Sequence, residues 1–356
     1  MKKKLVTIVC ILLVLLVSVF AGTVKTFGKS KSDYTKYQLD YTIYTKDGGV
    51  QSLDNTNLQI KQGEVKTIAF FGVDNRSNGN LDEGNSDVIM ICKLDTTTNS
   101  IKLVSIYRDT SLVMDGKKQI RKVNYAYNHG GPEKAIEVLN SNLDLNITDY
   151  VTVDFLALAD IIDSLGGIEL EPTEEEVGYI NEYNNETAFV TNKEHVDLTT
   201  SGKQVVNGVN AVAYCRIRYT EGGDFKRAER QRTVLNAVLS KVKTASVTDL
   251  KKILTSTFDE VSTSLSLSDI IELLPYVKNF SIDGMNAFPF ELNTKNYQGS
   301  YGWLDVPCSL ESNVTKLHRY LYDEINYTPS KTVTEYSNTI IKFSGFDTTD
   351  ATVVQY

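Results

Sequence analysis

The sequence predicts an α/β sandwich, because segments with the character of strands alternate along the chain with segments of helical spacing. Three short runs are rich in apolar and β-branched residues and are bounded by Gly, Asn or Asp, as strands of one sheet would be: 65–74, 87–95 and 101–109. Their nearly continuous apolar character indicates burial on both faces of that sheet. The alternation follows in three further segments: a helix at 132–143, a strand at 149–154 and a helix at 154–167.

Local signals mark the ends of the first two helices. Pro132 stands at a helix start, where its missing N–H costs nothing. Asp154 stands at the N-cap of the second helix, and Gly166 or Gly167 lies beyond its end. These signals agree with the apolar spacing, so both helices are expected to begin and end near these residues.

The second half of the chain continues with helices. A long one is predicted from Asp224, with a moderately apolar stripe through Val234, Leu235, Val238 and Val242. Further amphipathic segments occupy 248–279 and 312–325. Residues 171–200 are acidic and polar, which indicates a solvated surface insertion or a mobile flap beside a pocket. The Ser/Thr-rich end, 326–356, is predicted to be a weakly ordered tail.

Composition limits the class of protein. The 356 residues, 41% of them hydrophobic, are enough for one large domain or two small ones. The 45 acidic and 37 basic residues give a net charge of −8. A general nucleic-acid binder carries a broad basic surface and a high pI, so no nucleic-acid partner is expected.

The N-terminus predicts a membrane anchor. Three lysines precede an uninterrupted apolar run over 5–22, which as a helix would reach about 27 Å, enough to cross a bilayer core. The lysines place residues 1–4 in the cytoplasm and the rest of the chain outside the cell. A cleaved signal peptide is the alternative, since Val19 and Ala21 are small enough for a cleavage site. Residues 23–64 then have the composition of a spacer.

The four cysteines do not form a metal-binding or disulfide pattern. Cys10 lies in the anchor, and the other three are scattered singly: Cys92, Cys215 and Cys308. No CxxC or zinc spacing is present. These three are predicted to be small buried hydrophobic residues, with one disulfide among them as the alternative.

Polar residues of functional type gather first in GVDNRSNGNLDEGNSD, residues 72–87. Asp74 ends one predicted strand and Asp87 begins the next. If the two strands pair, their carboxylates face each other, and together with phosphate oxygens and water they suit Mg²⁺. A calcium EF-hand loop is excluded, because Arg76 and Asn85 stand where that loop needs ligands. The alternative is a pair of strand-capping aspartates in a turn.

A second group follows the strand at 101–109. Arg108 and Asp109 stand in SIYRDT at the end of a strand that is expected to be buried, and open α/β sheets bind ligands at the carboxyl ends of their strands. RKVNYAYNHGG then adds Lys122. A surface ion pair between Arg108 and Asp109 is the alternative.

The third group is RIRYTEGGDFKRAERQR, residues 216–232, with six basic side chains in an acidic protein. Arg216 and Arg218 alternate, so in an extended chain they point to one side. Arg227 and Gln231 lie on the helical line that continues into the buried stripe, whereas Lys226 and Arg230 can face solvent. Arginines converging at a helix N-terminus would bind a pyrophosphate. The alternative is an exposed basic helix with ion pairs to nearby acidic residues.

Other catalytic patterns are missing from the sequence. It has no Walker loop, no GxSxG and no HExxH, and its three histidines are far apart. The residue types therefore indicate Mg²⁺ and arginines acting on a phosphate ester. Outside the cell ATP is scarce, which favours a lipid-linked phosphate as the substrate.

Together these motifs resemble those of the LytR-CpsA-Psr family of cell-envelope proteins. The motifs GVDNR, SD at 86–87, SIYRDT, KVNYAYNHGG, DYVTVDFLALADIIDSLGGIEL and RIRYTEGGDFKRAERQR follow in the family's order. The resemblance is carried by 65–245 and extends in character to 325, which gives a predicted catalytic domain over 65–325. It implies a three-layer α/β/α sandwich with a central mixed sheet and a hydrophobic lipid-binding groove.

The resemblance also implies residue roles. Asp74 and Asp87 would hold Mg²⁺, while the pyrophosphate would be bound by Arg108, Arg216, Arg218 and Arg227, with Gln231 assisting and with Arg76 and Lys122 as additions. The reacting groups would be Arg108, Asp109, Arg216 and Arg218, with Asp109 as a possible base. Two positions depart from the family pattern: Asn85 stands where many members carry an arginine, and Tyr107 replaces the usual proline.

The leading hypothesis is an extracytoplasmic phosphotransferase. It would move a glycopolymer of the teichoic-acid or capsular type from a polyprenyl-pyrophosphate carrier to a peptidoglycan hydroxyl. Two alternatives stay open: a protein that binds the lipid pyrophosphate and regulates envelope synthesis without turnover, and a pyrophosphatase acting on the same carrier. Retention of both the carboxylates and the arginines favours catalysis.

Overall fold

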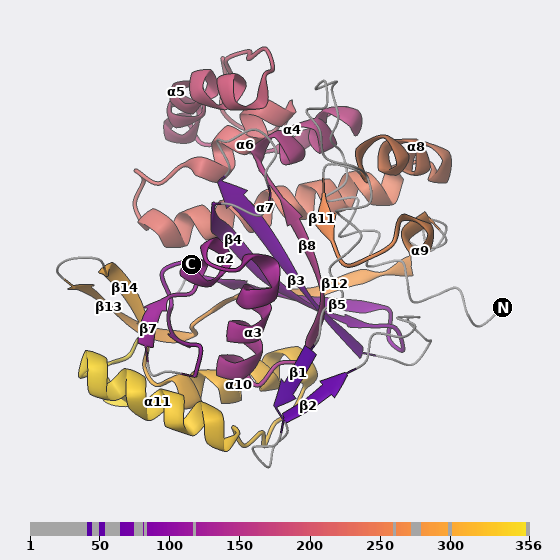
Figure 1. Ribbon diagram of the computed structural model, residues 1–356. Coiled ribbons are helices and arrows are strands. Elements are labelled where there is room, and N and C mark those ends of the chain that lie inside the picture. Colours follow the sequence, from indigo (N-terminus) through magenta and orange to yellow (C-terminus); the bar gives the residue numbers. More distant parts are fainter. Residues whose placement is uncertain are drawn as a thin grey trace.

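A central sheet organises the computed structural model, which describes residues 41–44, 50–53, 65–74, 81, 84–116, 119–258, 261–271, 279–297 and 301–353 (Figure 1). Six strands lie in the order β11-β8-β3-β4-β5-β12. In chain order they are β3 (Val65–Asp74), β4 (Asn85–Asp95), β5 (Ser100–Ile106), β8 (Ile147–Val153), β11 (Ser262–Thr263) and β12 (Ser281–Phe288). The sheet is mixed, because β3 runs parallel to β8 and β5 to β12, whereas the other neighbours are antiparallel.

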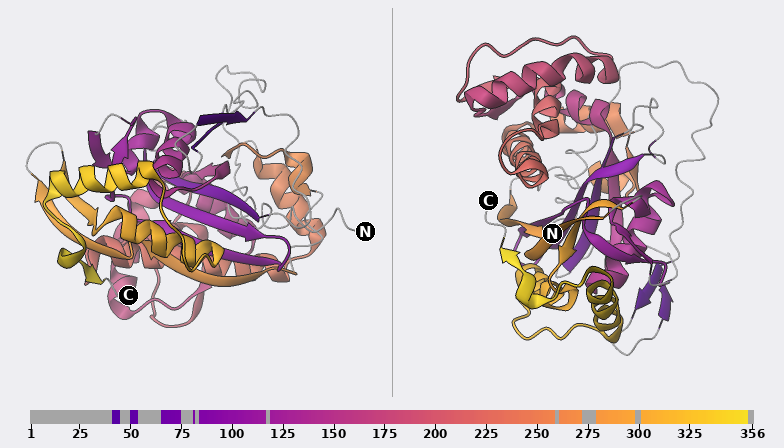
Figure 2. Two further views of the ribbon diagram at one scale, coloured as in Figure 1. Left: turned by 90° about the horizontal axis from the view of Figure 1, so that it is seen from below. Right: turned by 90° about the vertical axis from the view of Figure 1, so that its left-hand side faces the viewer.

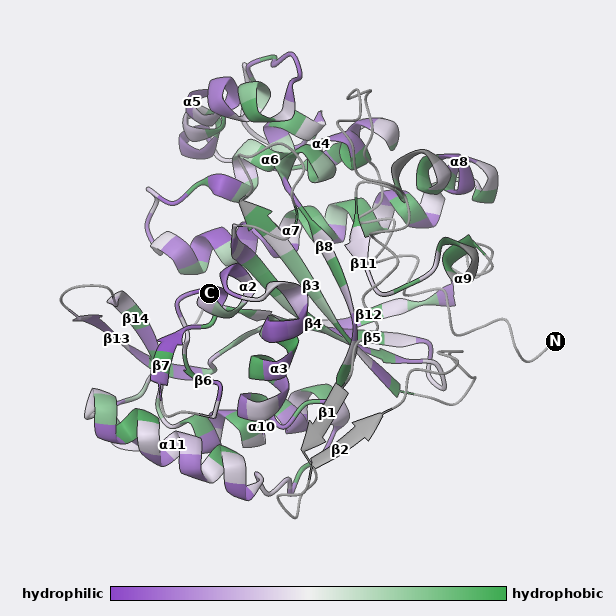
Figure 3. Ribbon diagram, viewed as in Figure 1, coloured by the Kyte–Doolittle hydropathy of each residue, from purple (hydrophilic) through white to green (hydrophobic). Residues whose placement is uncertain are grey.

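The central strands are buried on both faces, as their apolar character predicts. Along β3, Ile68 and Phe70 enter the hydrophobic cluster on one face, and Ala69 and Phe71 enter the cluster on the other. Alternate side chains of a strand point to opposite faces, so a continuous apolar run fits this position. Figure 3 shows the same strands coloured as hydrophobic along most of their length.

Helices cover both faces of the sheet, which confirms an α/β fold with a central mixed sheet (Figure 2). One cluster is built on α4 (Phe155–Ser164), α6 (Gly208–Arg216), α7 (Gly223–Thr244) and α8 (Val247–Thr257), with the short α9 (Leu267–Ile271) beside it. The other is built on α2 (Asn124–Asn128), α3 (Gly131–Leu143), α10 (Leu310–Tyr322) and α11 (Lys331–Ser344). The predicted helix starts are confirmed, since Pro132 lies in the first turn of α3 and Asp154 caps α4 by accepting from the Ala157 N–H.

Small ribbons surround the main sheet. They are β1 (Tyr41–Tyr44) with β2 (Val50–Leu53), β6 (Ser111–Met114) with β7 (Gln119–Lys122), β9 (Ile168–Leu170) with β10 (Gln204–Val206), and β13 (Glu291–Tyr297) between β14 (Gly302–Pro307) and β15 (Thr352–Val353). A short 3₁₀ turn, Thr348–Asp350, precedes β15.

One of two predictions from polarity is wrong. The acidic segment expected to be a surface insertion or a flap beside a pocket contains the 18-residue helix α5 (Glu174–Thr191), whose first turn is fixed by a reciprocal capping box between Thr173 and Glu176. The end of the chain, expected to be weakly ordered, forms α11, which buries Val333 and Ile340 completely in the second cluster. α11 is amphipathic, whereas α5 buries Ile180 and Ala188 together with polar side chains such as Asn184 and Thr187.

Cys92, Cys215 and Cys308 are free and buried, which confirms their prediction as small hydrophobic residues. The predicted anchor at 5–22 and most of the predicted spacer lie outside the described residues. Among the helices that are described, none combines the length and the apolar character needed to cross a membrane.

Candidate active site

The site forms where β3 ends and β4 begins. The two strands pair antiparallel, with Asp74 opposite Asn85, so the predicted juxtaposition of these strand ends is confirmed for the backbone. The ladder then shifts, since Gly72 pairs with Val88 and Val73 with Ser86. Asp87 is the extra residue of this bulge, and bulges commonly re-aim a side chain beside a functional site.

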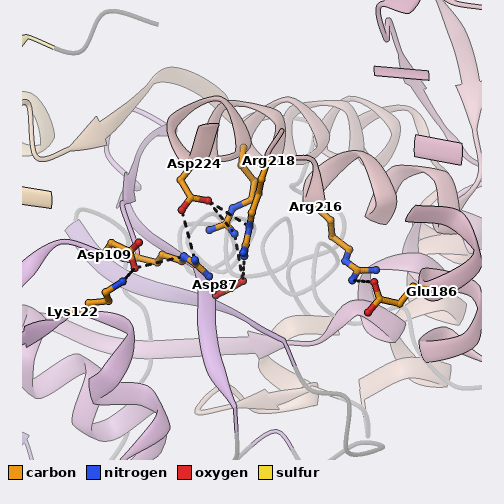
Figure 4. Close-up of polar contacts among 9 residues, drawn as sticks. Asp87, Asp109, Lys122, Glu186, Arg216, Arg218 and Asp224 are labelled. Atoms are coloured by element: carbon orange, nitrogen blue, oxygen red, sulfur yellow. Dashed lines mark hydrogen bonds and ion pairs between the residues drawn. The ribbon is translucent and has the colours of Figure 1, made fainter. Parts of the chain in front are cut away.

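Three arginines from distant segments converge on Asp87 (Figure 4). Arg108, just beyond β5, places Nη1 2.7 Å from Oδ1 of this carboxylate. Arg218, in the loop between α6 and α7, places Nη2 2.7 Å from Oδ2, and Arg227 Nη1 lies 3.5 Å from the same oxygen. The alternative in which Arg108 serves only a surface pair with Asp109 does not hold, because its guanidinium makes its shortest ion pair with Asp87.

A second carboxylate lies on the other side of these arginines. Asp224 Oδ1 is 3.3 Å from Arg227 Nη1 and 3.5 Å from Arg218 Nε, and Oδ2 is 3.6 Å from Arg108 Nη2. Asp224 stands in the first turn of α7, directly after the turn made by Gly222 and Gly223, whose φ angles are 88° and 51°. Glycine adopts these angles without steric cost, so the turn delivers Asp224 to the cluster.

Burial and charge set the protonation of the cluster. Burial alone would raise the pKa of Asp87, but Arg227, Arg108 and Arg218 together hold this pKa below its usual value. Burial also lowers the pKa of Arg227 to about 10, against the pull of Asp224 and Asp87. Arg227 therefore stays charged at neutral pH. By formal charge, the three arginines exceed the carboxylates of Asp87 and Asp224 by one positive charge.

Arg227 lies on the buried face of α7, as predicted. Arg230 does not lie on the solvent face that was expected for it. Arg227 is only 4% exposed, at the head of the buried stripe of α7. Arg230, expected to face solvent, is 2% exposed and pairs through Nε with Glu176 of α5 at 2.7 Å. Lys226 pairs with Glu229 on the outer side of the helix.

Arg216 also departs from its expected orientation. The residue ends α6 instead of lying in an extended segment, so its side chain is not parallel to that of Arg218. It donates to Glu186 Oε2 at 2.7 Å and to Thr187 Oγ1 at 2.8 Å, both on α5, away from Asp87 (Figure 4). It nevertheless lines the same cavity as Arg218.

Asp109 and Lys122 form a pair beside the arginines. Lys122 Nζ lies 2.9 Å from Asp109 Oδ1, and Arg108 Nε lies 3.7 Å from the same oxygen. Lys122 thus faces Asp109 and not Asp87. Both predicted residues therefore lie at the site, where they form an ion pair with each other.

An apolar cavity of about 360 Å³ opens from the charged cluster. The sheet supplies one wall and α4 and α7 supply the other, with Phe70, Met90, Leu158, Val234 and Val238 among the lining residues. The predicted stripe of α7 therefore lines this cavity as well as the core. Polar residues line the part of the cavity next to the charged cluster, which we call the rim; they include Asp87, Arg216, Arg218, Arg227, Glu186 and Gln231. Close packing of α4 on α6 supports this wall, because a Cβ on Gly208 would overlap the carbonyl oxygen of Ala159.

The donor set at the strand ends is compatible with a hard cation. Asp87 accepts one short bond at each carboxylate oxygen, which leaves further lone pairs for a cation such as Mg²⁺. The Asp74 backbone pairs with Asn85, two residues before Asp87, but the Asp74 side chain and all of Arg76 lie outside the described residues. Within the described part, no group of three His, Cys, Asp or Glu residues could hold a metal by itself.

Sequence reasoning missed Asp305. This residue of β14 sits beside the cluster, and burial, followed by the charges of Asp109 and Asp224, raises its pKa to about 7. In the sequence it stands between Leu304 and Val306, an isolated carboxylate in a strand-like apolar run. That pattern is the one signal that could have found it.

A model of the LytR_cpsA_psr family matches residues 25–319. The chain belongs to the LytR_cpsA_psr family. The family prediction is thereby confirmed. Among relatives, polyisoprenyl-teichoic acid–peptidoglycan teichoic acid transferase TagU of Enterococcus faecalis is 28% identical, over 78% of this chain and 85% of the relative. TagU of Bacillus cereus is 31% identical, over 62% of this chain and 67% of the relative.

Solved structures share the fold of this LytR_cpsA_psr protein. Protein gbs0355 from Streptococcus agalactiae aligns with a TM-score of 0.65 at 24% identity, over 79% of this chain and 95% of the other. TagV of B. subtilis aligns with a TM-score of 0.58 at 26% identity, over 75% and 99%. The family protein YwtF (TagT), solved with bound octaprenyl pyrophosphate lipid, aligns with a TM-score of 0.53 at 20% identity, over 73% and 91%.

Proposed function

We propose that this protein transfers a teichoic acid from a polyprenyl-pyrophosphate carrier to a hydroxyl group of peptidoglycan. The observation that carries the proposal is the convergence of Arg108, Arg218 and Arg227 at the mouth of an apolar cavity. Such a site offers charge to a pyrophosphate and apolar surface to the chain attached to it. The names of the TagU and TagV relatives, which specify this transfer, support the same reading.

The residues of the arginine cluster and of the cavity rim have distinct roles in this reaction. Arg108, Arg218 and Arg227 bind the pyrophosphate and neutralise the charge that grows on the bridging oxygen as its bond to phosphorus breaks. Asp224 keeps the three guanidinium groups oriented. Gln231, one turn after Arg227 and also on the cavity rim, is placed to donate to a phosphate oxygen. Arg216 stands on the rim nearer α5, where it can meet the glycan end of the donor.

Mg²⁺ is part of the proposal. Asp87 and Asp74 are the residues that would hold it, and the bound cation would neutralise phosphate charge. Removal of Mg²⁺ with EDTA should abolish transfer, and added Mg²⁺ should restore it. Transfer that persists at full rate in EDTA would remove the cation from the proposal.

We also propose that residues 5–22 anchor the protein in the cell membrane, with the outer domain facing the cell wall. Three lysines before an apolar run support this orientation. Protease added to intact protoplasts should cleave the outer domain of the full-length chain. Protection of the domain until the membrane is opened would contradict the orientation.

The transfer itself can be tested with the outer domain, a polyprenyl-pyrophosphate-linked teichoic acid precursor, Mg²⁺ and peptidoglycan oligomers. Wild type should join the polymer to peptidoglycan, and Arg218→Ala should lose the activity. Lys226→Ala is the matched control, since Lys226 lies on the outer side of α7 and pairs with Glu229. Release of phosphate without joining would show a pyrophosphatase instead, and tight lipid binding without turnover would show a regulatory protein.

A further inference from the structure

One face of the β13–β14 hairpin carries side chains that suit a sugar. The register pairs Thr294 with Asp305 and Asn296 with Trp303, so these four residues lie on the same face of the two strands. Trp303 is the one tryptophan in the sequence, and it is 59% exposed. Thr294 and Asn296 are exposed beside it. A pyranose ring packs its C–H face on an indole, while amide and hydroxyl groups bond to its hydroxyls.

The inner end of this face is fixed to the arginine cluster. Leu292, at the start of the hairpin, packs with Tyr107 and with Phe225 and Ala228 of α7. The Asp305 N–H donates to the Asp109 carbonyl oxygen at 3.0 Å. Trp303 and Asp305 are two residues apart on one strand, roughly 7 Å. The face therefore runs from an exposed aromatic ring to the edge of the proposed phosphate site.

Asp305 also borders a second, much smaller cavity, of about 20 Å³. Asp87, Arg108, Asp224, Arg227 and Gln231 line the same space. This volume suits about one water molecule or one hydroxyl oxygen. A hydroxyl placed there would lie between the carboxylate of Asp305 and the arginines that bind the pyrophosphate.

The carboxylates of the site differ in their ability to accept a proton. Asp87 is held ionised with a lowered pKa by three arginines, which makes it a poor base. Asp109 is occupied by Lys122, whose Nζ lies 2.9 Å from its Oδ1. Asp305 has no ion pair in the described part of the chain. Burial and the charges of Asp109 and Asp224 raise its pKa to about 7, while Lys122 and Arg108 act in the opposite direction. A general base works best when its pKa lies near the working pH.

We propose that this face of the β13–β14 hairpin binds the acceptor saccharide, with Trp303 packing on a sugar ring and Asp305 taking the proton of the attacking hydroxyl. The assignment rests on the proposed transfer reaction. The acceptor O–H bond breaks and its proton passes to Asp305. The acceptor oxygen bonds to the phosphorus that carries the glycan, and the bond from that phosphorus to the bridging oxygen breaks. Polyprenyl phosphate leaves, and Asp305 then releases the proton to water.

Binding can be measured without turnover, because Trp303 is the only fluorescent indole. Titration of wild type with soluble peptidoglycan oligosaccharides should change its emission in a saturable way, whereas maltooligosaccharides should not. This readout does not depend on the donor lipid. An absence of any change with peptidoglycan oligosaccharides, in a protein that does transfer, would overturn the saccharide subsite and leave the proposed function standing.

Kinetic measurements distinguish the proposed roles of Trp303 and Asp305. Trp303→Ala should raise KM for the acceptor about tenfold with little change in kcat. Phe189→Ala, which removes an aromatic side chain that is 85% exposed on α5, is the control and should change neither value. Asp305→Asn should lower kcat by roughly 10²- to 10⁴-fold and remove the limb of the pH profile near pH 7. Trp303→Ala and Asp305→Asn should each bind octaprenyl pyrophosphate as wild type does.

Two results would contradict these assignments. An unchanged pH profile in Asp305→Asn would show that Asp305 is not the base. An equal loss of lipid binding in both variants, with a lowered Tm, would show that the hairpin only supports the arginine cluster. If wild type binds oligosaccharide but transfers nothing, the saccharide subsite stands and the proposed function fails.

Discussion

Arg218 Nη2 lies 2.7 Å from Asp87 Oδ2, although 131 positions separate the two residues. The same carboxylate also meets Arg108 and Arg227, so one acidic side chain holds together three cations that would otherwise repel one another. A phosphate ligand would compete with Asp87 for these guanidinium groups. Asp87 therefore has two opposing effects on a pyrophosphate: it orders the arginines, and it offsets their charge.

Binding without metal should separate these effects. In EDTA, Arg218→Ala should weaken octaprenyl pyrophosphate binding by about tenfold or more, because a charge-assisted bond is lost. Asp87→Asn should bind at least as tightly as wild type, since it removes the competing charge and keeps the shape. Calorimetric titration of the protein measures both dissociation constants.

Lys226→Ala serves as the control for lost positive charge on α7, because its partner is Glu229 and not the cluster. A loss of affinity in Asp87→Asn equal to that of Arg218→Ala would show that Asp87 mainly orders the arginines. Both variants should keep the unfolding temperature of wild type within a few degrees if the comparison is to hold.

The buried pair of Arg230 and Glu176 should matter more for stability than for chemistry. Arg230 also donates to Thr220 Oγ1 at 2.7 Å and to the Ile217 carbonyl oxygen at 3.3 Å, so it ties α7 and α5 to the segment that carries Arg218. Arg230→Met should destabilise the fold by about 3–5 kcal/mol, because it leaves the buried Glu176 carboxylate without its positively charged partner. Urea unfolding at neutral pH measures the change.

A double variant tests the reason for that loss. Glu176→Gln keeps a side chain that can serve the capping box at Thr173 and removes the charge. Arg230→Met combined with Glu176→Gln should therefore recover part of the stability lost in Arg230→Met alone. If the double variant is less stable than the single one by the full cost of Glu176→Gln, the two residues act independently.

The sequence was sufficient where structure depends on local pattern. The strand at 65–74 follows from its continuous apolar run, and the strand predicted at 149–154 lies at 147–153. The inward face of Arg227 follows from helical spacing and is confirmed. Arg216 and Arg230 were placed wrongly, because their directions depend on α5, whose acidic composition hid its helix. The Thr173 and Glu176 capping pattern is the local signal in the sequence for the start of this helix.

Contacts between distant segments could not be predicted. Asp305 reaches the site only because β14 docks beside the end of β5, where its N–H bonds to Asp109. No short-range feature of the sequence specifies that docking. The role of Asp224 had the same limit, since its nearness to Arg108 depends on how α7 lies across the sheet.

The C-terminal helix α11 should contribute to the stability of the whole domain. Ile340 is fully buried in the hydrophobic cluster built on α2, α3, α10 and α11. Ile340→Ala should lower the free energy of unfolding by about 2–5 kcal/mol, because it removes buried apolar surface and leaves a cavity. Asn338→Ala, at an exposed position two residues away, should change it by less than about 0.5 kcal/mol. Equal stability of the two variants, by urea unfolding, would mean that α11 is dispensable to the core.

The pH dependence of stability should have a contribution from Asp154. This residue caps α4, where its Oδ1 accepts from the Ala157 N–H at 2.9 Å, and it lines the large cavity. Burial, with a smaller contribution from Asp160, raises its pKa to about 7. The unfolded value is about 3.9, so between these two pH values the folded protein retains a proton that the unfolded chain has lost. Stability from this group is complete below about pH 4 and is lost as pH rises to 7.

Asp154→Asn should remove that dependence, since asparagine caps a helix equally well and does not ionise. Relative to wild type, the variant should gain stability by on the order of 1 kcal/mol per pH unit between pH 4 and 7, with no further gain above pH 7. Urea unfolding from pH 4.5 to 8 measures the difference. Asp283→Asn, at an exposed position on β12, is the control and should follow wild type. A constant difference between Asp154→Asn and wild type across this range would mean that Asp154 is already ionised in the folded protein at pH 4.5.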